Sequence, residues 1–356
     1  MVSVNLGSSD LFKPLKIGKI ELKHRVVLAP LTRNRVTDDE IADVKGDLVR
    51  EYYDQRSKKE GTLIITEGVA ITTEHIKNLP PIFSIPVYLN ENRDTWKPIF
   101  DTVHANKSFI FLQAWWGTLA KDQTEDISSF TKDKLKAVIN YFIDAAERAF
   151  KDGADGLELH FANGFTVFNF LNPFINQRTD EYGGSIENRT RFALEIVDAL
   201  GEKFGYDKFG VRISPFFRHS TEDIHPDTLA TYAHLVGELE SRRLKGKEVA
   251  YIHAVEPRAL EADGSVNKEW LHENIEFIPA IWNGVVIRAS NFIEENEHAA
   301  NVVKTNPKTA IAFGRYFISN PDLPHRLEKG LELNPYDRAT FYTKGPEGYI
   351  DYEFAK

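Results

Sequence analysis

Short apolar runs recur along the chain and alternate with longer stretches in which apolar residues repeat at helical spacing. The runs are almost continuously hydrophobic, which is typical of parallel strands whose two faces are both covered. We therefore predict that each run is a buried strand. The eight runs span residues 25–31, 62–69, 108–114, 156–160, 209–213, 250–255, 284–288 and 309–313.

The stretches between the runs are predicted to be amphipathic helices. The spacing is clearest at residues 135–150, 192–200, 229–239 and 323–331. Gly153 is expected to end the first of these helices, because glycine is favoured just past a helix C-terminus. Asn320 and Pro321 are expected to be the N-cap and the first residue of a helix near the end of the chain.

Eight repeats of strand and helix predict an α/β fold, a single (β/α)8 TIM barrel that occupies residues 1–356 as one domain. A doubly wound open sheet is the alternative. Residues 15–23, centred on Ile17-Gly18-Lys19, are predicted to form an N-terminal β-hairpin that plugs the barrel at the end where its strands begin.

Charge narrows the classes of function. The 356 residues include 53 acidic and 44 basic side chains, and the net charge of −9 argues against nucleic acid or anionic membranes as partners. No apolar run reaches the roughly 18 residues of a membrane span, and the N-terminus lacks the pattern of a signal peptide. We expect a cytoplasmic monomer or homodimer that acts on a small molecule.

Sulfur-containing residues are almost absent. The chain has no cysteine, and its one methionine is Met1, a composition that we interpret as that of a redesigned sequence, with an unusual natural composition as the alternative. Without thiols, redox chemistry would require a bound organic cofactor. His219 and His225 lack the spacing of a metal site, so we expect solvated loop residues and no metal.

Residues after the last two predicted strands are suited to a phosphate group. In TIM barrels the active site lies at the C-terminal ends of the strands, often with a phosphate site after the seventh and eighth. Ser290 and Asn291 follow the seventh run, and Gly314 and Arg315 follow the eighth. Glycine allows close backbone approach, and arginine can bind two phosphate oxygens. The alternative is a surface ion pair of Arg315 beside a glycine that merely ends a strand.

The first five predicted strands also end in polar residues. These are Thr32, Glu67 with the adjacent Gly68, Gln113, His160 and Arg212. A flavin ring needs donors and acceptors along its pyrimidine edge and a cation near N1 and O2, a role that suits Arg212 because arginine stays protonated. The alternative is that Arg212 neutralises a carboxylate at a strand end.

His160 and Asn163 lie three positions apart at the end of the fourth predicted strand. If the chain turns there, both side chains could donate to one carbonyl oxygen and stabilise the enolate that forms when hydride adds to an enone. The alternative is that each is a structural hydrogen-bonding residue in a loop.

Motifs along nearly the whole chain resemble the old yellow enzyme family of FMN-dependent ene-reductases, in its yeast-type form. The longest motif is NQRTDEYGGSIENR at residues 176–189. The others are LAPLTR at 28–33, ITEG at 65–68, Gln113, GVR at 210–212, GRYFISNPDL at 314–323 and YDRATFY at 336–342.

The resemblance implies an enzyme that takes hydride from NADPH onto bound FMN and reduces the C=C bond of an α,β-unsaturated carbonyl compound, with ping-pong kinetics. His160 and Asn163 match the pair that binds the substrate carbonyl, and Trp115 matches an aromatic residue that steers the substrate. The implied FMN contacts are Pro30, Thr32, Gly68, Gln113, Arg212, Ser290, Asn291, Gly314, Arg315, Phe341 and Tyr342, the last also at the mouth of the active site.

The chain departs from the family pattern around the substrate. Phe165 occupies the position of a proton-donating tyrosine, so the resemblance implies protonation from water, or isomerisation of the alkene by the same flavin. Ser290 replaces a usual glycine, and the connection at 117–130 is short, which predicts a more open pocket. Further unexpected residues are Thr166, Val167, Phe168, Asn169, Phe174 and Ile175.

Two alternatives from other classes stay open at this point. One is a redesigned flavin-binding barrel with little turnover. The other is an unrelated phosphate-binding barrel such as an aldolase, against which the lack of a convincing Schiff-base lysine or metal cluster counts.

Overall fold

The computed structural model describes residues 2–35, 47–72, 93–117, 126–218, 224–257 and 273–356. His219 and most of the connection at 117–130 lie outside these ranges. Every one of the eight predicted strand runs overlaps a strand, and the run at 62–69 overlaps two, the second of which begins at its last residue. The strands are β4 (Val26–Leu28), β5 (Leu63–Ile65), β6 (Val69–Ala70), β7 (Phe109–Trp115), β8 (Gly156–Phe161), β9 (Phe209–Ile213), β10 (Tyr251–Val255), β11 (Val286–Ala289) and β12 (Thr309–Phe313).

These strands form one parallel sheet whose hydrogen-bonded order is β5, β4, β12, β11, β10, β9, β8, β7, β6. An additional pairing of β5 with β7, in which Leu63 is opposite Phe109, returns the sheet to its first strand. The prediction of a closed (β/α)8 barrel is therefore confirmed, and the doubly wound sheet is wrong because such a sheet keeps two open edges. Strand residues such as Val26, Leu63 and Ile252 are fully buried, as the continuous apolar runs indicated.

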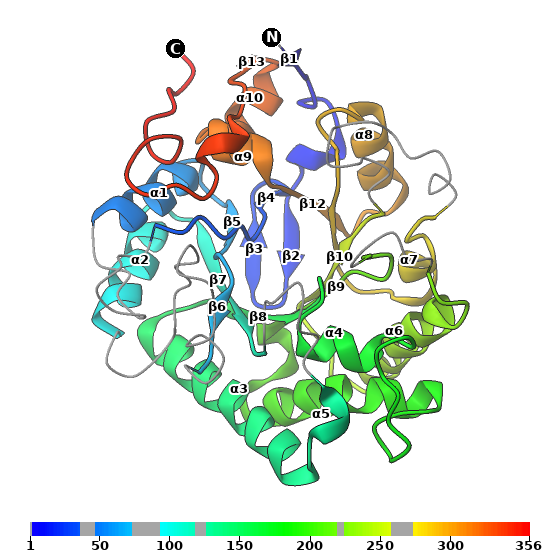
Figure 1. Ribbon diagram of the computed structural model, residues 1–356. Helices are drawn as coiled ribbons and strands as arrows, with labels where there is room; N and C mark the ends of the chain where they lie inside the picture. Colours follow the sequence, from blue (N-terminus) through cyan, green and yellow to red (C-terminus); the bar gives the residue numbers. More distant parts are fainter. Residues whose placement is uncertain (1, 36–46, 73–92, 118–125, 219–223, 258–272) are drawn as a thin grey trace. The chain divides into compact units, whose positions relative to one another are not determined.

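Helices follow the strands as predicted (Figure 1). In α3 the apolar residues Leu135, Val138 and Phe142 are buried while Lys134 and Lys136 alternate with them at more exposed positions. The helices are α1 (Asp47–Ser57), α2 (Arg93–Ala105), α3 (Lys132–Asp152), α4 (Thr166–Leu171), α5 (Ile186–Phe204), α6 (Thr228–Leu244), α7 (Phe277–Ile281), α8 (Asn296–Thr305), α9 (Arg315–Ser319) and α10 (Leu323–Lys329). Short 3-10 turns lie at Asp10–Phe12, Ile127–Ser129, Tyr206–Lys208 and Arg338–Thr340.

The expected helix start at Asn320 is wrong. Asn320 is the C-cap of α9, and Asp322 is the N-cap of α10, with Pro324 in its first turn. Asn320 is completely buried, and its amide accepts from the Asn334 N–H at 2.7 Å and donates to the Asn334 carbonyl at 3.1 Å. The side chain of Asn320 therefore bonds the backbone of Asn334 instead of capping a helix as the local pattern predicted.

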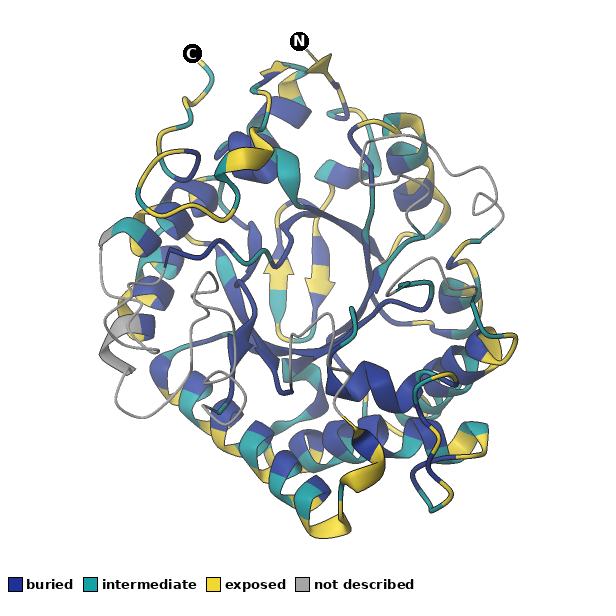
Figure 2. Ribbon diagram, in the orientation of Figure 1, coloured by how far each residue is buried: buried dark blue, intermediate teal, exposed yellow. Residues whose placement is uncertain are grey.

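The N-terminal hairpin is present. Strands β2 (Leu15–Ile17) and β3 (Ile20–Leu22) pair antiparallel and bury Leu15 and Ile17, while Lys16 and Glu21 face outward. Glu21 shares a shallow pocket with Gly61 and Ser108, which precede β5 and β7. The hairpin thus lies at the end where these strands begin, as predicted, and Figure 2 shows the contrast between its buried and exposed positions.

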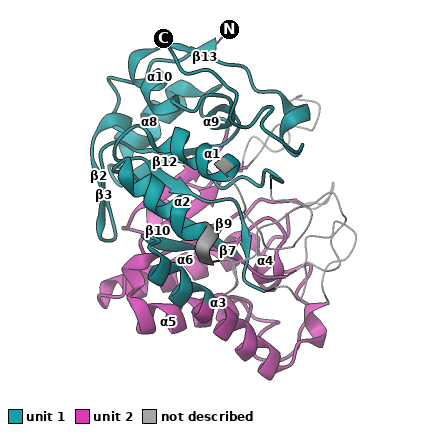
Figure 3. Ribbon diagram, turned by 90° about the vertical axis from the view of Figure 1, so that its left-hand side faces the viewer, with its two compact units in different colours: residues 1–114, 145–158, 291–356 teal, residues 115–144, 159–290 magenta. Residues whose placement is uncertain are grey.

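The described chain divides into two compact units (Figure 3). Unit 1 consists of residues 1–114, 145–158 and 291–356, and unit 2 consists of residues 115–144 and 159–290. Within unit 1, β1 (Val2–Ser3) pairs antiparallel with β13 (Glu332–Leu333). A single domain over residues 1–356 stays a prediction. In the described ranges, no helix has the length and hydrophobicity to cross a membrane.

Candidate active site

The predicted phosphate residues of unit 1 contact one another. Arg315, the first residue of α9, donates to Asn291 Oδ1 at 2.5 Å and to the Tyr336 hydroxyl at 3.1 Å. These acceptors are neutral, so neither bond compensates the positive charge of the guanidinium. Gly314 lies directly before α9, and a Cβ there would meet Leu31 Cδ2 at 3.3 Å. The turn therefore combines a cation with a tight backbone, which suits an anion.

Gln113 has a fixed amide orientation in unit 1. Its Nε2 donates to Glu158 Oε1 at 2.6 Å, and both residues are almost completely buried. The Gln113 backbone N–H donates to Thr66 Oγ1 at 3.0 Å. Because Nε2 is taken by Glu158, the Oε1 atom of Gln113 is the end that can accept a hydrogen bond from a ligand. The sequence analysis missed Glu158. An acidic residue within an apolar strand was a signal, because a buried carboxyl group needs a hydrogen-bonding partner inside the protein.

The remaining predicted cofactor residues of unit 1 lie in three segments. Pro30 and Thr32 follow β4, with Pro30 buried and Thr32 half-buried. Gly68 is buried between β5 and β6. Phe341 is half-buried and Tyr342 has 60% of its surface exposed in the C-terminal segment.

His160 on β8 is a buried, neutral imidazole. Burial, and after it the nearby charge of Arg212, holds the pKa of His160 well below its usual range. The Ala162 N–H donates to His160 Nδ1 at 3.3 Å. With Nδ1 as the acceptor, the ring proton of the neutral form lies on Nε2, which can donate to a ligand.

The chain turns at Asn163 and Gly164, shortly after the end of β8 at Phe161, as the predicted pairing of His160 with Asn163 requires. Asn163 has a left-handed backbone with φ of 56°, and its N–H donates to Ser214 Oγ at 2.8 Å. Gly164 continues the turn at a φ of 84°. An asparagine tolerates this conformation better than most residues, so the turn constrains the residue type at position 163.

Phe165 packs against two other predicted substrate residues in unit 2. Its ring centre lies 4.4 Å from that of His160 and 4.8 Å from that of Trp115. Phe165 and Trp115 are both buried. Gly117 lies two residues after Trp115 and has a φ of 116°. It is so close to the start of α4 that an added Cβ would lie 1.8 Å from Thr166 Oγ1. An aromatic wall without a hydroxyl group therefore lies beside the imidazole.

Arg212 and Ser290 complete the predicted set in unit 2. Arg212 lies on β9 opposite His253 of β10, and both side chains are buried. Sequence reasoning missed His253, which also contributes to the low pKa of His160. Ser290 directly follows β11 and is half-buried.

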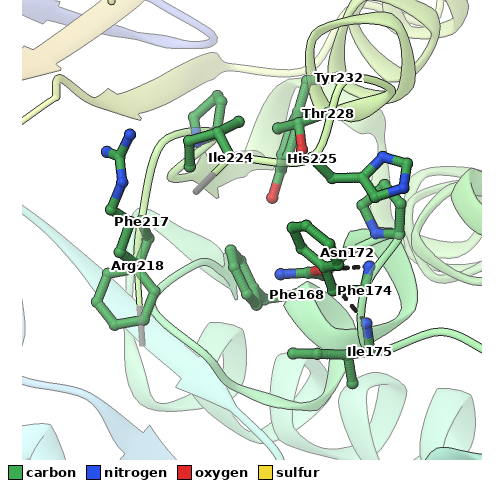
Figure 4. A pocket seen from close by; sticks show the side chains of 12 residues that line it. Phe168, Asn172, Phe174, Ile175, Phe217, Arg218, Ile224, His225, Thr228 and Tyr232 are labelled. Carbon is green, nitrogen blue, oxygen red and sulfur yellow. Dashed lines mark hydrogen bonds between the residues drawn. The ribbon is translucent and has the colours of Figure 1, made fainter. Parts of the chain in front are cut away.

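Some of the unexpected residues gather at a separate pocket of unit 2 (Figure 4). Phe168, Phe174 and Ile175 line it together with His225, whose ring lies 4.7 Å from that of Phe174. The volume open to water-sized molecules is only about 40 Å³, enough for a few waters and too small for a substrate. His225, expected to be a solvated loop residue, is half-buried there.

Comparisons with known proteins identify the family. The model of the NADH:flavin oxidoreductase / NADH oxidase family matches residues 10–334. The chain is 40% identical to Enoate reductase 1 of Kluyveromyces lactis, over 98% of this chain and 94% of that protein. It is 34% identical to the "Probable inactive dehydrogenase easA" of Claviceps fusiformis, over 99% of this chain and 96% of that protein.

A solved structure agrees with this assignment. Old Yellow Enzyme from Pichia sp. AKU4542 matches with a TM-score of 0.85 and 32% identity, covering 98% of this chain and 94% of that structure. The implied cofactors are FMN and, as hydride donor, NADPH. The chain belongs to the NADH:flavin oxidoreductase / NADH oxidase family and is an NAD(P)H-dependent flavoenzyme of the old yellow enzyme type.

Proposed function

We propose that the protein reduces the activated C=C bond of α,β-unsaturated carbonyl compounds with hydride from NADPH. The observation that carries this proposal is the state of His160. A neutral imidazole whose Nε2 bears the proton can donate a hydrogen bond to a carbonyl oxygen, and the low pKa keeps the ring in this neutral form. Asn163, in the turn three residues later, would supply the second donor.

The residues of unit 1 fit an FMN. Arg315, Asn291 and the backbone of Gly314 would hold the phosphate, since the two bonds of Arg315 to neutral groups leave its charge uncompensated by them. The oriented Oε1 of Gln113 would accept from the pyrimidine edge. Further contacts would come from Pro30, Thr32, Gly68, Phe341 and Tyr342, and in unit 2 from Arg212 and Ser290. When bound, FMN supplies the hydride chemistry that the side chains lack.

The side chains of unit 2 would bind the substrate. His160 and Asn163 would polarise the carbonyl group, which makes the β-carbon electrophilic. Trp115 and Phe165 would form an apolar wall that orients the alkene. Because the Phe165 ring carries no exchangeable proton, the α-carbon would have to be protonated by water. We expect saturation of the double bond to be slow for this reason.

Isomerisation of the alkene is the second candidate function. The contact of Phe165 with both His160 and Trp115 favours it, since a hydroxyl group is missing from the wall beside the imidazole. A flavin-binding barrel with little turnover is the remaining alternative. A cytoplasmic location and a monomeric or homodimeric state stay predictions.

Anaerobic flavin reduction followed by product analysis tests the proposal. The protein is loaded with FMN, reduced with NADPH without oxygen, and then mixed with cyclohexenone and with enones that have E and Z isomers. Reoxidation of the flavin with a saturated product is the expected result. An isomerised alkene would instead establish the second candidate function. Reduced flavin that is neither reoxidised by any enone nor able to isomerise one, or a protein that takes up no FMN, would contradict both.

A further inference from the structure

Two buried arginines in the segment after β4 hold a segment near the C-terminus. We call residues 340–348 the C-terminal strap. Arg33 donates from Nε to the Phe341 carbonyl at 3.0 Å and from Nη2 to the Gly348 carbonyl at 2.8 Å. These acceptors lie at the two ends of the strap and more than 300 positions from Arg33 along the chain.

Arg35 binds the strap at more points than Arg33. Its Nη1 atom also donates to the Arg33 carbonyl at 2.7 Å, which fixes the two arginines to each other. Its acceptors within the strap are the carbonyl oxygens of Thr340 (3.0 Å), Phe341 (3.2 Å), Gly345 (3.1 Å) and Glu347 (2.8 Å) and the hydroxyl of Thr343 (3.2 Å).

This use of arginine has a physical reason. The strap has little regular secondary structure, so its carbonyl groups need donors from elsewhere. A planar guanidinium supplies five N–H groups in a fixed fork, whereas a lysine ammonium supplies three on a flexible stem. Arg33 and Arg35 are 1% and 4% exposed. Their charges act on the buried Glu67, whose Oε2 accepts a hydrogen bond from the backbone N–H of Arg33 at 3.4 Å.

We call Arg33 and Arg35, with their hydrogen bonds to the strap, the clamp. Both ends of the clamp adjoin proposed cofactor residues. Arg33 directly follows Thr32, and the strap carries Phe341 and Tyr342. The Phe341 ring lies 5.7 Å from that of Tyr336, whose hydroxyl accepts from Arg315. The clamp therefore joins the Thr32 segment, the strap and the turn of Arg315 within unit 1.

We propose that Arg33 and Arg35 are positioning residues that hold the C-terminal strap, with Phe341 and Tyr342, in place over bound FMN. The inference rests on the proposed function, because the strap has a cofactor to cover only if FMN binds in unit 1. Loss of the clamp would free the strap and let the flavin leave faster, while the barrel strands keep their own pairing.

Proteolysis and flavin release together test the clamp. Lys344 is an exposed trypsin site inside the strap. The FMN-loaded parent is compared with Arg35→Gln and Arg35→Lys, and with Arg338→Gln as a matched control, since Arg338 is exposed just before the strap. Mass spectrometry follows cleavage after Lys344, and flavin fluorescence follows FMN dissociation.

We expect Arg35→Gln to raise both rates at least about tenfold, the factor for one lost hydrogen bond to a charged group. Arg35→Lys should lie between it and the parent, and Arg338→Gln should match the parent. If Arg35→Gln were cleaved after Lys344 and released FMN at the same rates as the parent, the inference would be overturned. If that variant does not fold, Arg35→Lys decides in the same way.

The proposed function and the clamp can fail separately. Cleavage after Lys344 is also measured without FMN, where the clamp predicts the same order of variants. A parent protein that binds no FMN would refute the proposed function and the cofactor-covering role. Faster cleavage in Arg35→Gln without any change in FMN release would likewise overturn the positioning role and leave only a structural tie.

Discussion

Arg315 and Asn291 contact each other, with Nη2 of the arginine 2.5 Å from Oδ1 of the asparagine. The two residues follow different strands, β12 and β11, and sequence reasoning assigned both to a phosphate group. Their direct bond holds the guanidinium in place before an anion arrives. A preorganised cation binds with a smaller loss of side-chain entropy than one that must first be ordered.

Replacement of Arg315 should weaken FMN binding. Arg315→Ala removes a charge-assisted donor, so we expect the Kd for FMN to rise about 10- to 100-fold. Asn291→Ala should have a smaller effect, because Arg315 keeps its bond to Tyr336. Quenching of flavin fluorescence measures the Kd, with the exposed Arg338→Ala as control. An unchanged Kd in Arg315→Ala would exclude the turn after β12 as the phosphate site.

Glu158 should matter for stability as well as for the cofactor. Glu158→Leu leaves the buried Nε2 of Gln113 without its partner and should lower the free energy of unfolding by about 1–3 kcal/mol. Glu158→Gln keeps an acceptor and should lower it less. Urea denaturation measures both, with the surface change Glu202→Gln expected to stay within about 0.5 kcal/mol. Equal stability of Glu158→Leu and the parent would show that the amide contact is unimportant.

A hydroxyl group at position 165 should speed saturation of the substrate. Phe165→Tyr places a proton donor beside His160 and Trp115, and general acid catalysis contributes about 100-fold or more. The measurement is the rate of flavin reoxidation by cyclohexenone together with the fraction of saturated product. Phe174→Tyr is the control, because Phe174 is half exposed at the separate pocket. A rate and product that stay unchanged in Phe165→Tyr would refute the proton-donor argument.

His24 should make the protein less stable in acid. Burial, the largest cause, lowers the pKa of His24 to about 4, and its ring lies 3.0 Å from Thr62 Oγ1. The unfolded chain takes up a proton near pH 6.5, whereas the folded chain does so only near pH 4. The contribution of His24 to the free energy of unfolding is therefore complete above about pH 6.5. It falls by roughly 3 kcal/mol in all as the pH decreases to about 4.

Urea denaturation between pH 7 and pH 4 tests this dependence. His24→Gln should be less stable than the parent at neutral pH, because it disrupts a buried site, but should lose less stability on acidification. His325→Gln, at another histidine of unit 1, serves as control. Parallel pH profiles for His24→Gln and the parent would contradict the assignment.

The sequence predicted those parts of the fold that follow from local pattern. Strands covered on both faces leave continuous apolar runs, so all eight positions were recognised, but the run at 62–69 divides because the Glu67 N–H turns to the Tyr53 hydroxyl. The turn on which the pairing of His160 with Asn163 was conditional is present at Asn163 and Gly164. The rival of an unrelated phosphate-binding barrel is wrong, since the chain belongs to the flavin oxidoreductase family.

Contacts between distant residues could not be predicted in this way. Asn320 was assigned to a helix start because its partner, Asn334, lies in a separate loop. The acceptors of Arg33 and Arg35 follow about 300 residues later, and nothing in the local sequence marks them. Glu158 was overlooked because its strand was judged by its apolar neighbours. Such residues are recognised only when the fold brings their partners to them.

The pairing of β4 with β5 and β12 has a consequence for synthesis on the ribosome. Val26, Val27 and Leu28 emerge early, yet β12, with which they pair, is made near the end of the chain. At a translation rate of about 5–20 residues per second, β4 stays unpaired with β12 for roughly a quarter of a minute to a minute. The nascent chain should therefore depend on chaperones during that interval. Truncated chains that end before residue 309 should aggregate instead of folding.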